Sequence, residues 1–190
     1  MLQIRTMRPD DWGSYGRHAQ DQGGGWNSPS ISALTADHAC VDALSLIVEA
    51  DGTVVAGIRH WRVLMGEYVP ALLMERTFVK PTHVDEGLEA WLIRESLDRA
   101  YRLGHRVVVT LGHPERFRRF GFSRSLGAAF SLPGYECQDE ETLLVMEFCP
   151  GTLMGVNGPI NRWSENEDDA ITSGMNSGPW TYQGATATAE

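Results

Sequence analysis

Residues 72–122 constrain the fold most, because they bring together a strand, a loop, a helix and a second strand. The segment Leu72–Val79 predicts a strand that is closed by Pro81. A helix is expected over about Glu86–Leu103, and a second strand over Arg106–Leu111. The start of a helix carries unpaired backbone N–H groups and the positive end of the helix dipole. The loop before this helix is therefore a place where an anionic cofactor can be held.

Size and charge exclude several classes of protein. The chain has 190 residues, enough for one domain with a core of its own, and a net charge of −9 that argues against binding nucleic acid or an anionic membrane. Its three cysteines, Cys40, Cys137 and Cys149, are odd in number and have no metal-ligand spacing. We therefore expect neither disulfides nor a metal site. Without a signal sequence or a bilayer-length apolar stretch, a cytoplasmic protein is expected.

The remaining elements predict a mixed sheet flanked by helices. Further strands are expected at Leu2–Met7, Ala43–Glu49, Val54–Val63, Ala128–Leu132 and Thr142–Phe148, and further helices at about Asp10–Ala19, Pro29–His38 and Pro114–Phe120. The fold class is α/β, of the α+β kind, with a mostly antiparallel sheet of about seven strands.

The end of the chain differs in character from the rest. Residues 164–190 contain acidic residues but no lysine or arginine, and many Gly, Ser, Thr and Ala. Such a segment does not form a core of its own. We divide the chain into a domain over 1–163 and an acidic tail over 164–190, extended or docked. Trp180 and Tyr182 suit docking onto the domain or, in a homodimer, onto a second copy.

Several short runs carry a family resemblance. They are Met7–Asp11, Leu103–His105, Leu111–Glu115 and Arg119–Phe122. Together with the order of elements over 1–163, they resemble the GNAT superfamily of acyl-CoA-dependent N-acyltransferases, in particular its YhbS-like branch. The resemblance implies transfer of an acyl group from acetyl-CoA or another acyl-CoA to an amine of a small molecule or peptide.

The resemblance also implies a set of cofactor-binding positions. In the family, backbone groups on the strand before the loop pair with pantetheine, and a loop of the form Gln/Arg-x-x-Gly-x-Gly/Ala wraps the pyrophosphate. Aligned on Gly87, this chain has Val84 in place of the leading Gln/Arg and Glu89 in place of the last glycine. The expected cofactor contacts are Phe78, Val79, Asp85, Glu86, Gly87, Leu88, Glu89 and Arg119.

The loop leaves three interpretations open. Asp85, Glu86 and Glu89 put carboxylates where the family holds an anion, although acidic residues also stabilise a helix start. The chain is then an acyltransferase, or a catalytically degenerate GNAT-fold protein that serves as a binding or assembly module. In the third interpretation acyl-CoA binds in a shifted pose, with Arg116, Arg118 and Arg119 as its phosphate ligands.

Two residues are candidates for catalysis. Family members often use a tyrosine after the central strand as proton donor, but the matching positions here are Arg116 and Phe117. Tyr135 is the substitute candidate, or else a packing aromatic. Glu75 is a candidate base, or else an ion-pair partner of Arg59, Arg62 or Arg76. His60 and His83 are expected at the surface.

Overall fold

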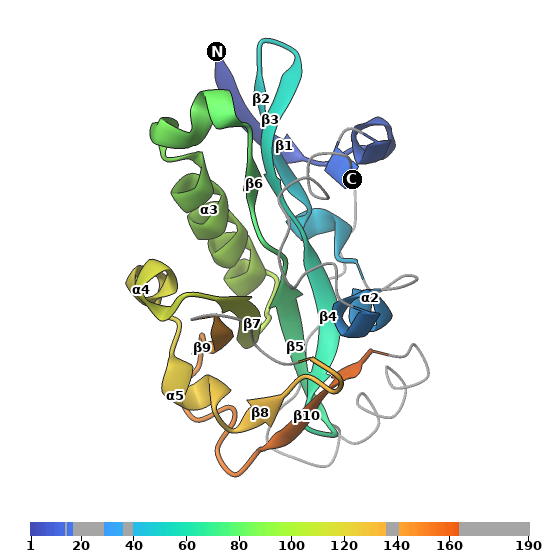
Figure 1. Ribbon diagram of the computed structural model, residues 1–190, viewed down its shortest axis with the longest axis vertical. Coiled ribbons are helices and arrows are strands. Elements are labelled where there is room, and N and C mark those ends of the chain that lie inside the picture. Colours follow the sequence, from blue (N-terminus) through green and yellow to red (C-terminus); the bar gives the residue numbers. More distant parts are fainter. Residues whose placement is uncertain (14, 17–28, 36–39, 136–140, 164–190) are drawn as a thin grey trace, which may run out of the picture.

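The computed structural model describes residues 1–13, 15–16, 29–35, 40–135 and 141–163. Over these ranges the chain forms ten strands in two sheets, with helices on both sides (Figure 1). The predicted mixed, mostly antiparallel α+β class is confirmed, although strands are more numerous than the expected seven. The tail 164–190 and residues 14 and 17–19 of the first predicted helix lie outside the described residues.

A four-stranded antiparallel sheet forms the upper half of the molecule in Figure 1. Its strands, in spatial order, are β1 (Leu2–Thr6), β2 (Leu46–Ala50), β3 (Thr53–Ile58) and β6 (Phe78–Val79). A hairpin turn at Asp51-Gly52 joins β2 to β3, with φ of 47° and 79° at the two residues. Positive φ at both central positions matches the twist of the strands that the turn joins.

A six-stranded mixed sheet forms the lower half. Its strands, in spatial order, are β8 (Phe130–Ser131), β10 (Gly158–Arg162), β4 (His60–Met65), β5 (Val69–Met74), β7 (Val107–Gly112) and β9 (Thr142–Glu147). The pairs β5–β7 and β8–β10 are parallel and the others antiparallel. Every residue of β7 is buried, as predicted for the central strand. The sequence analysis missed β10.

The helices lie on both faces of the sheets (Figure 1). They are η1 (Pro9–Asp11), α2 (Pro29–Thr35), η3 (Asp42–Leu44), η4 (Pro81–Glu86), α3 (Leu88–Arg102), α4 (Pro114–Phe117), η5 (Arg118–Phe120) and α5 (Arg124–Gly127). The predicted start of the long helix at Glu86 is wrong, because residues 81–86 form a separate 3₁₀ helix. Gly87 then reverses the backbone with a φ of 71° before α3 begins.

Two predicted strands are each divided in two. Val54–Val63 is interrupted at Arg59 and becomes β3 and β4, while Leu72–Val79 is interrupted at 75–77 and becomes β5 and β6. In each case the first and second parts pair in different sheets. Polar residues stand at both breaks, Arg59 in the first segment and Glu75-Arg76-Thr77 in the second. They do not by themselves show that a strand ends there, because a strand can carry polar side chains on one face.

The core has two main parts, one on each face of the six-stranded sheet. Alternate residues of β7 separate them: Val108 packs with α3, whereas Val107 and Val109 pack with Ile31 of α2. No described helix is both long enough and apolar enough to cross a membrane.

His60 was expected at the surface, but it is fully buried. Its Nδ1 lies 3.2 Å from the carbonyl oxygen of Leu44, and its Nε2 has no hydrogen-bond partner among the residues that the structure describes. Burial lowers the pKa of His60 to about 3. Burial also lowers the pKa of the nearby His105. Both imidazoles are therefore held in the neutral form in the folded protein.

This burial predicts a fold that loses stability in mild acid. Between about pH 6.5 and pH 3 the unfolded chain protonates His60 and the folded chain does not, so stability falls as the pH is lowered. From pH 6 to pH 4 the free energy of unfolding should drop by about 2.5 kcal/mol through His60 alone. Urea unfolding at a series of pH values measures this. In His60→Asn, which retains a donor for Leu44, most of the drop should disappear; an unchanged slope would assign it to other groups.

Candidate active site

Beyond Met74, the strands β5 and β7 stop pairing and their continuations diverge. The parallel pairing covers Leu72 with Val108 and Leu73 with Val109. The hydroxyl of Thr110 then donates a hydrogen bond of 2.9 Å to the carbonyl of Met74. After that point the chain enters β6, the edge strand of the four-stranded sheet, while β7 continues beside β9. β6 and β7 are therefore neighbouring segments that belong to different sheets.

An ion pair lies where two segments of the chain, β3–β4 and β5–β6, each pass from one sheet to the other. Arg59 separates β3 from β4, and Glu75 follows β5. Arg59 donates from Nε to Oε2 of Glu75 at 2.6 Å and from Nη2 to Oε1 at 3.0 Å. The backbone N–H of Glu75 donates to the carbonyl of Arg59 at 2.9 Å. Side chains and backbone thus join the two breaks to each other.

Aromatic rings surround this ion pair. The Cζ of Arg59 lies 4.5 Å from the ring centre of Tyr15, 4.9 Å from Trp61 and 5.6 Å from Trp12. The hydroxyl of Tyr15 donates to Oε2 of Glu75 at 3.3 Å, and burial raises the pKa of Tyr15 well above its ordinary value. The expectation that Glu75 pairs with one of three arginines is met by Arg59. Its role as a base stays a prediction.

The predicted pantetheine contacts lie on β6. The Phe78 side chain is buried beside Tyr15, with ring centres 5.1 Å apart and nearly perpendicular planes. Gly57 permits this contact, since a Cβ there would lie 2.8 Å from the Phe78 ring. Val79 is half-buried against the core on the α3 side. The side chains of both residues are thus in packing contacts.

The predicted pyrophosphate loop is helical. Asp85 and Glu86 are exposed at the end of η4, and Gly87 has open space around it. Among the described residues no side chain caps the start of α3, and of the three carboxylates only Glu89 lies in the first turn of this helix. Leu88 is buried in the core and anchors the helix. Glu89 turns away from the loop and pairs with Arg116 of α4, with Oε1 and Nη2 2.7 Å apart.

The residues after β7 have structural contacts. A Cβ at Gly112 would lie 2.4 Å from Cε2 of Phe117, so α4 rests directly on the end of β7. Phe117 is thus a packing residue and cannot donate a proton. The guanidinium of Arg119 lies 4.8 Å from the ring centre of Phe120. Tyr135 follows β8 and is half-buried against the core on the α2 side.

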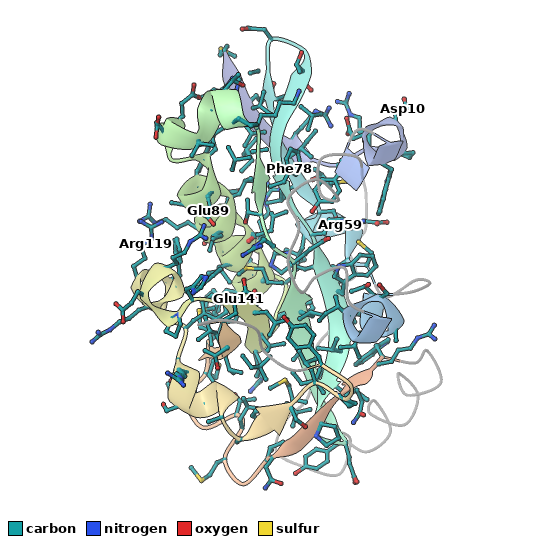
Figure 2. All side chains as sticks on the ribbon, viewed as in Figure 1. Asp10, Arg59, Phe78, Glu89, Arg119 and Glu141 are labelled. Atoms are coloured by element: carbon teal, nitrogen blue, oxygen red, sulfur yellow. The ribbon has the colours of Figure 1, made fainter. Side chains whose placement is uncertain are left out.

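Figure 2 shows Arg59 and Phe78 over the middle of the sheet, with Glu89 and Arg119 at the left beside α3 and α4. Tyr15 and Thr110 were not expected from the sequence to belong to this site. Thr110 had a signal, as the one polar side chain in the buried run 107–111. Tyr15 had none, because its contact with Glu75 spans 60 residues.

A further pair, Arg76 and Glu141, was also missed. Arg76 lies in the break between β5 and β6, and Glu141 just precedes β9; Nη2 and Oε1 are 2.7 Å apart. Within the described ranges, no three His, Cys, Asp or Glu side chains are grouped as metal ligands.

Comparisons with solved structures identify this arrangement. The structure is similar to the GNAT family N-acetyltransferase YhbS from Escherichia coli in complex with CoA, with a TM-score of 0.68 and 24% identity over 88% of this chain and 92% of that one. It is also similar to a GNAT family acetyltransferase from Brucella melitensis in complex with acetyl-CoA, with a TM-score of 0.56 and 26% identity over 79% and 90%. The chain has the GNAT fold.

A third GNAT-fold relative is the ribosomal-protein-S18-alanine N-acetyltransferase from Escherichia coli, with a TM-score of 0.56 and 12% identity over 77% of this chain and 94% of that one. No protein-family model and no curated protein matches the sequence. At these identities the GNAT fold is established by the course of the backbone, and the chemistry has to be argued from this chain's own residues.

Loss of the Arg59–Glu75 pair should destabilise the GNAT fold measurably. In Glu75→Gln, Arg59 stays largely buried without its counter-charge, and we expect a loss of about 2–3 kcal/mol, below the value for a fully buried pair. Asp98→Asn is the control, because it breaks an exposed pair with Arg102 worth about 0.5 kcal/mol or less. Urea unfolding compares them. Equal losses of unfolding free energy in the two variants would show that the Arg59–Glu75 pair does not hold the two strand breaks together.

Gly112→Ala should disturb the contact between α4 and the end of β7. The new methyl group would overlap the Phe117 ring, and overpacking of this kind costs about 1–3 kcal/mol. Gly13→Ala is the matched control, because no described atom outside its chain neighbours and its own helix backbone lies within 4 Å of the added carbon, and alanine favours a helix. Thermal unfolding reports both changes. In Gly112→Ala combined with Phe117→Leu, part of the loss should be recovered; no recovery would place the strain elsewhere.

Proposed function

We propose that this protein transfers an acyl group from acyl-CoA to an amine. The observation that carries the proposal is the divergence of β6 from β7 beyond Met74, which separates two strand segments at the centre of the fold. Similar structures from Escherichia coli and Brucella melitensis are complexes with CoA and acetyl-CoA, which supports the same kind of cosubstrate here.

The pantetheine arm is assigned to the space between β6 and β7. Pantetheine is an extended chain with two amide groups, so it can pair with a strand edge as a peptide does. β6 is such an edge, since β3 is its only strand partner among the described residues. The backbone groups of Phe78 and Val79 are the proposed partners.

The chemical step needs few protein groups. The amine nitrogen attacks the thioester carbonyl, a C–N bond forms, the C–S bond breaks, and the proton lost by the amine balances the one gained by the thiolate. Holding the two reactants together and polarising the carbonyl supply most of the rate enhancement. Tyr135 remains the candidate donor to the thiolate.

Glu75 remains the candidate base, directly or through a water molecule. Both of its carboxylate oxygens accept hydrogen bonds from Arg59, and Oε2 accepts a third from Tyr15. A proton taken from the acceptor amine therefore has to bind to a Glu75 oxygen that already accepts a hydrogen bond from Arg59 or Tyr15. A water molecule bound at Glu75 meets that requirement more readily than direct transfer, and we favour it.

The acceptor is assigned only to a class. A primary amine of a small molecule or a peptide fits the proposed reaction, and a net charge of −9 favours a cationic acceptor. A cytoplasmic location and a homodimer formed through the tail 164–190 remain part of this proposal.

A second candidate is a GNAT-fold binding or assembly module without catalysis. One observation favours it: the segment that should wrap a pyrophosphate is a 3₁₀ helix ending in the exposed carboxylates Asp85 and Glu86. A pair of like charges about 4 Å apart costs about 1 kcal/mol in water and about 4 kcal/mol at a partly buried site. Several such pairs could abolish micromolar binding, which is worth about 8 kcal/mol.

Binding of acetyl-CoA separates the two candidates. At 100 times its dissociation constant, a ligand of the folded state stabilises it by about 2.7 kcal/mol, which raises the melting temperature by several degrees. Val84→Gln combined with Glu89→Gly restores the family pattern and should strengthen binding. If millimolar acetyl-CoA produces no shift in melting temperature and no calorimetric heat, the binding module is favoured.

A further inference from the structure

We propose that the phosphate groups of acyl-CoA are bound by an arginine surface made of Arg94, Arg116 and Arg119, and not by the acidic segment 81–86. This inference rests on the proposed function, because it names the part of this chain that would recognise the charged end of the cosubstrate. Arg94 lies on α3, Arg116 on α4 and Arg119 on η5.

Two of these arginines converge on one aromatic ring. The Cζ atoms of Arg94 and Arg119 lie 5.7 Å and 4.8 Å from the ring centre of Phe120. Both side chains are exposed, and neither forms an ion pair within the part of the chain that the structure describes. In a chain with 25 acidic and 16 basic residues, two neighbouring arginines without a carboxylate partner are unexpected. Their positive charge is available to an anion.

The ring that carries them is held from below. The ring centres of Phe117 and Phe120 are 6.5 Å apart, and those of Phe117 and Phe122 are 5.6 Å apart. Phe117 in turn rests on Gly112, where no Cβ intervenes. The arginine surface is thus built on a packed aromatic group at the end of β7, which fixes where the guanidinium groups lie.

The third arginine already binds an anion within the chain. Nη2 of Arg116 lies 2.7 Å from Oε1 of Glu89, and both side chains are partly exposed. A carboxylate and a phosphate present similar oxygen acceptors to a guanidinium. A phosphate oxygen can therefore replace Glu89 at Arg116. In that case Glu89 competes with the ligand.

The position suits the charged end of the cosubstrate. β6 leads through η4 into α3, and β7 leads directly into α4, so these two helices flank the divergence assigned to pantetheine. Figure 2 shows Glu89 and Arg119 on this side of the sheet. Phosphate groups that extend from between β6 and β7 toward α3 and α4 lie near these arginines. Asp85 and Glu86, at the end of η4, repel them.

Calorimetry with CoA and with pantetheine, which has no diphosphate or nucleotide, tests the inference. Arg94→Gln and Arg119→Gln should each weaken CoA binding about fivefold to tenfold, as expected for a lost charge-assisted contact, and pantetheine binding less than twofold. Arg102→Gln removes the same charge from the same helix, but from a pair with Asp98, and should change CoA binding less than twofold.

The role of Glu89 has its own matched control. Glu89→Gln frees Arg116 and should strengthen CoA binding about threefold to tenfold. Glu86→Gln removes the same charge near the same helix start, but Glu86 forms no ion pair with Arg116, so its effect should be clearly smaller. Equal effects of the two variants would mean that only the overall charge matters, which overturns the competition between Glu89 and phosphate.

Adenosine 3′,5′-bisphosphate and inorganic pyrophosphate distinguish the sources of the phosphate. The bisphosphate should compete with CoA and lose affinity in Arg119→Gln. Pyrophosphate that binds as tightly as CoA would identify a general anion site and overturn the inference. Unchanged CoA binding in both arginine variants overturns the arginine assignment and leaves the acyltransferase proposal standing. Failure of both CoA and pantetheine to bind overturns the proposed function itself.

Discussion

The rest of the structure depends on the ion pair between Arg59 and Glu75. Both residues lie where a continuous stretch of chain leaves one sheet and enters the other, and their side chains and backbone join the two breaks. Because β5 leaves β7 at this point, the junction also determines where β6 and β7 diverge. Three aromatic rings around Arg59 shield the pair from water, which strengthens it. The Arg59–Glu75 ion pair thus both stabilises the fold and sets the geometry of the candidate site.

The charges around the divergence are unevenly distributed. Carboxylates lie on the loop after β6, where a glycine-rich turn would bring backbone N–H groups to a phosphate, whereas arginines lie on α3, α4 and η5. The pair between Glu89 and Arg116 joins the two groups. An anion that approaches from solvent meets repulsion on one side and guanidinium groups on the other. Any acyl-CoA binding in this chain therefore depends more on side-chain charge than on the loop backbone.

The sequence was informative where local pattern and packing agree. The buried strand β7, the hairpin at Asp51-Gly52, and the end of α3 near Gly104 follow from apolar runs and turn residues. It was uninformative where a run of similar residues serves two sheets. Arg59 is a charged residue within Val54–Val63, but the sequence does not show that it forms a junction, because its partner Glu75 is 16 residues away. His60 is the clearest error: a histidine beside an arginine indicates exposure, yet its neighbours in space are Leu44 and the core.

By itself the sequence determined most of the order of strands and helices, the burial of the central strand, and the acidic character of the segment after β6. These are local properties, fixed by side-chain periodicity and composition. Only the tertiary structure decided which strands pair, where the two sheets separate, and that Arg59 holds Glu75 while Arg116 holds Glu89. Those outcomes depend on contacts between residues distant in the chain, and a linear pattern does not contain the distance between two side chains.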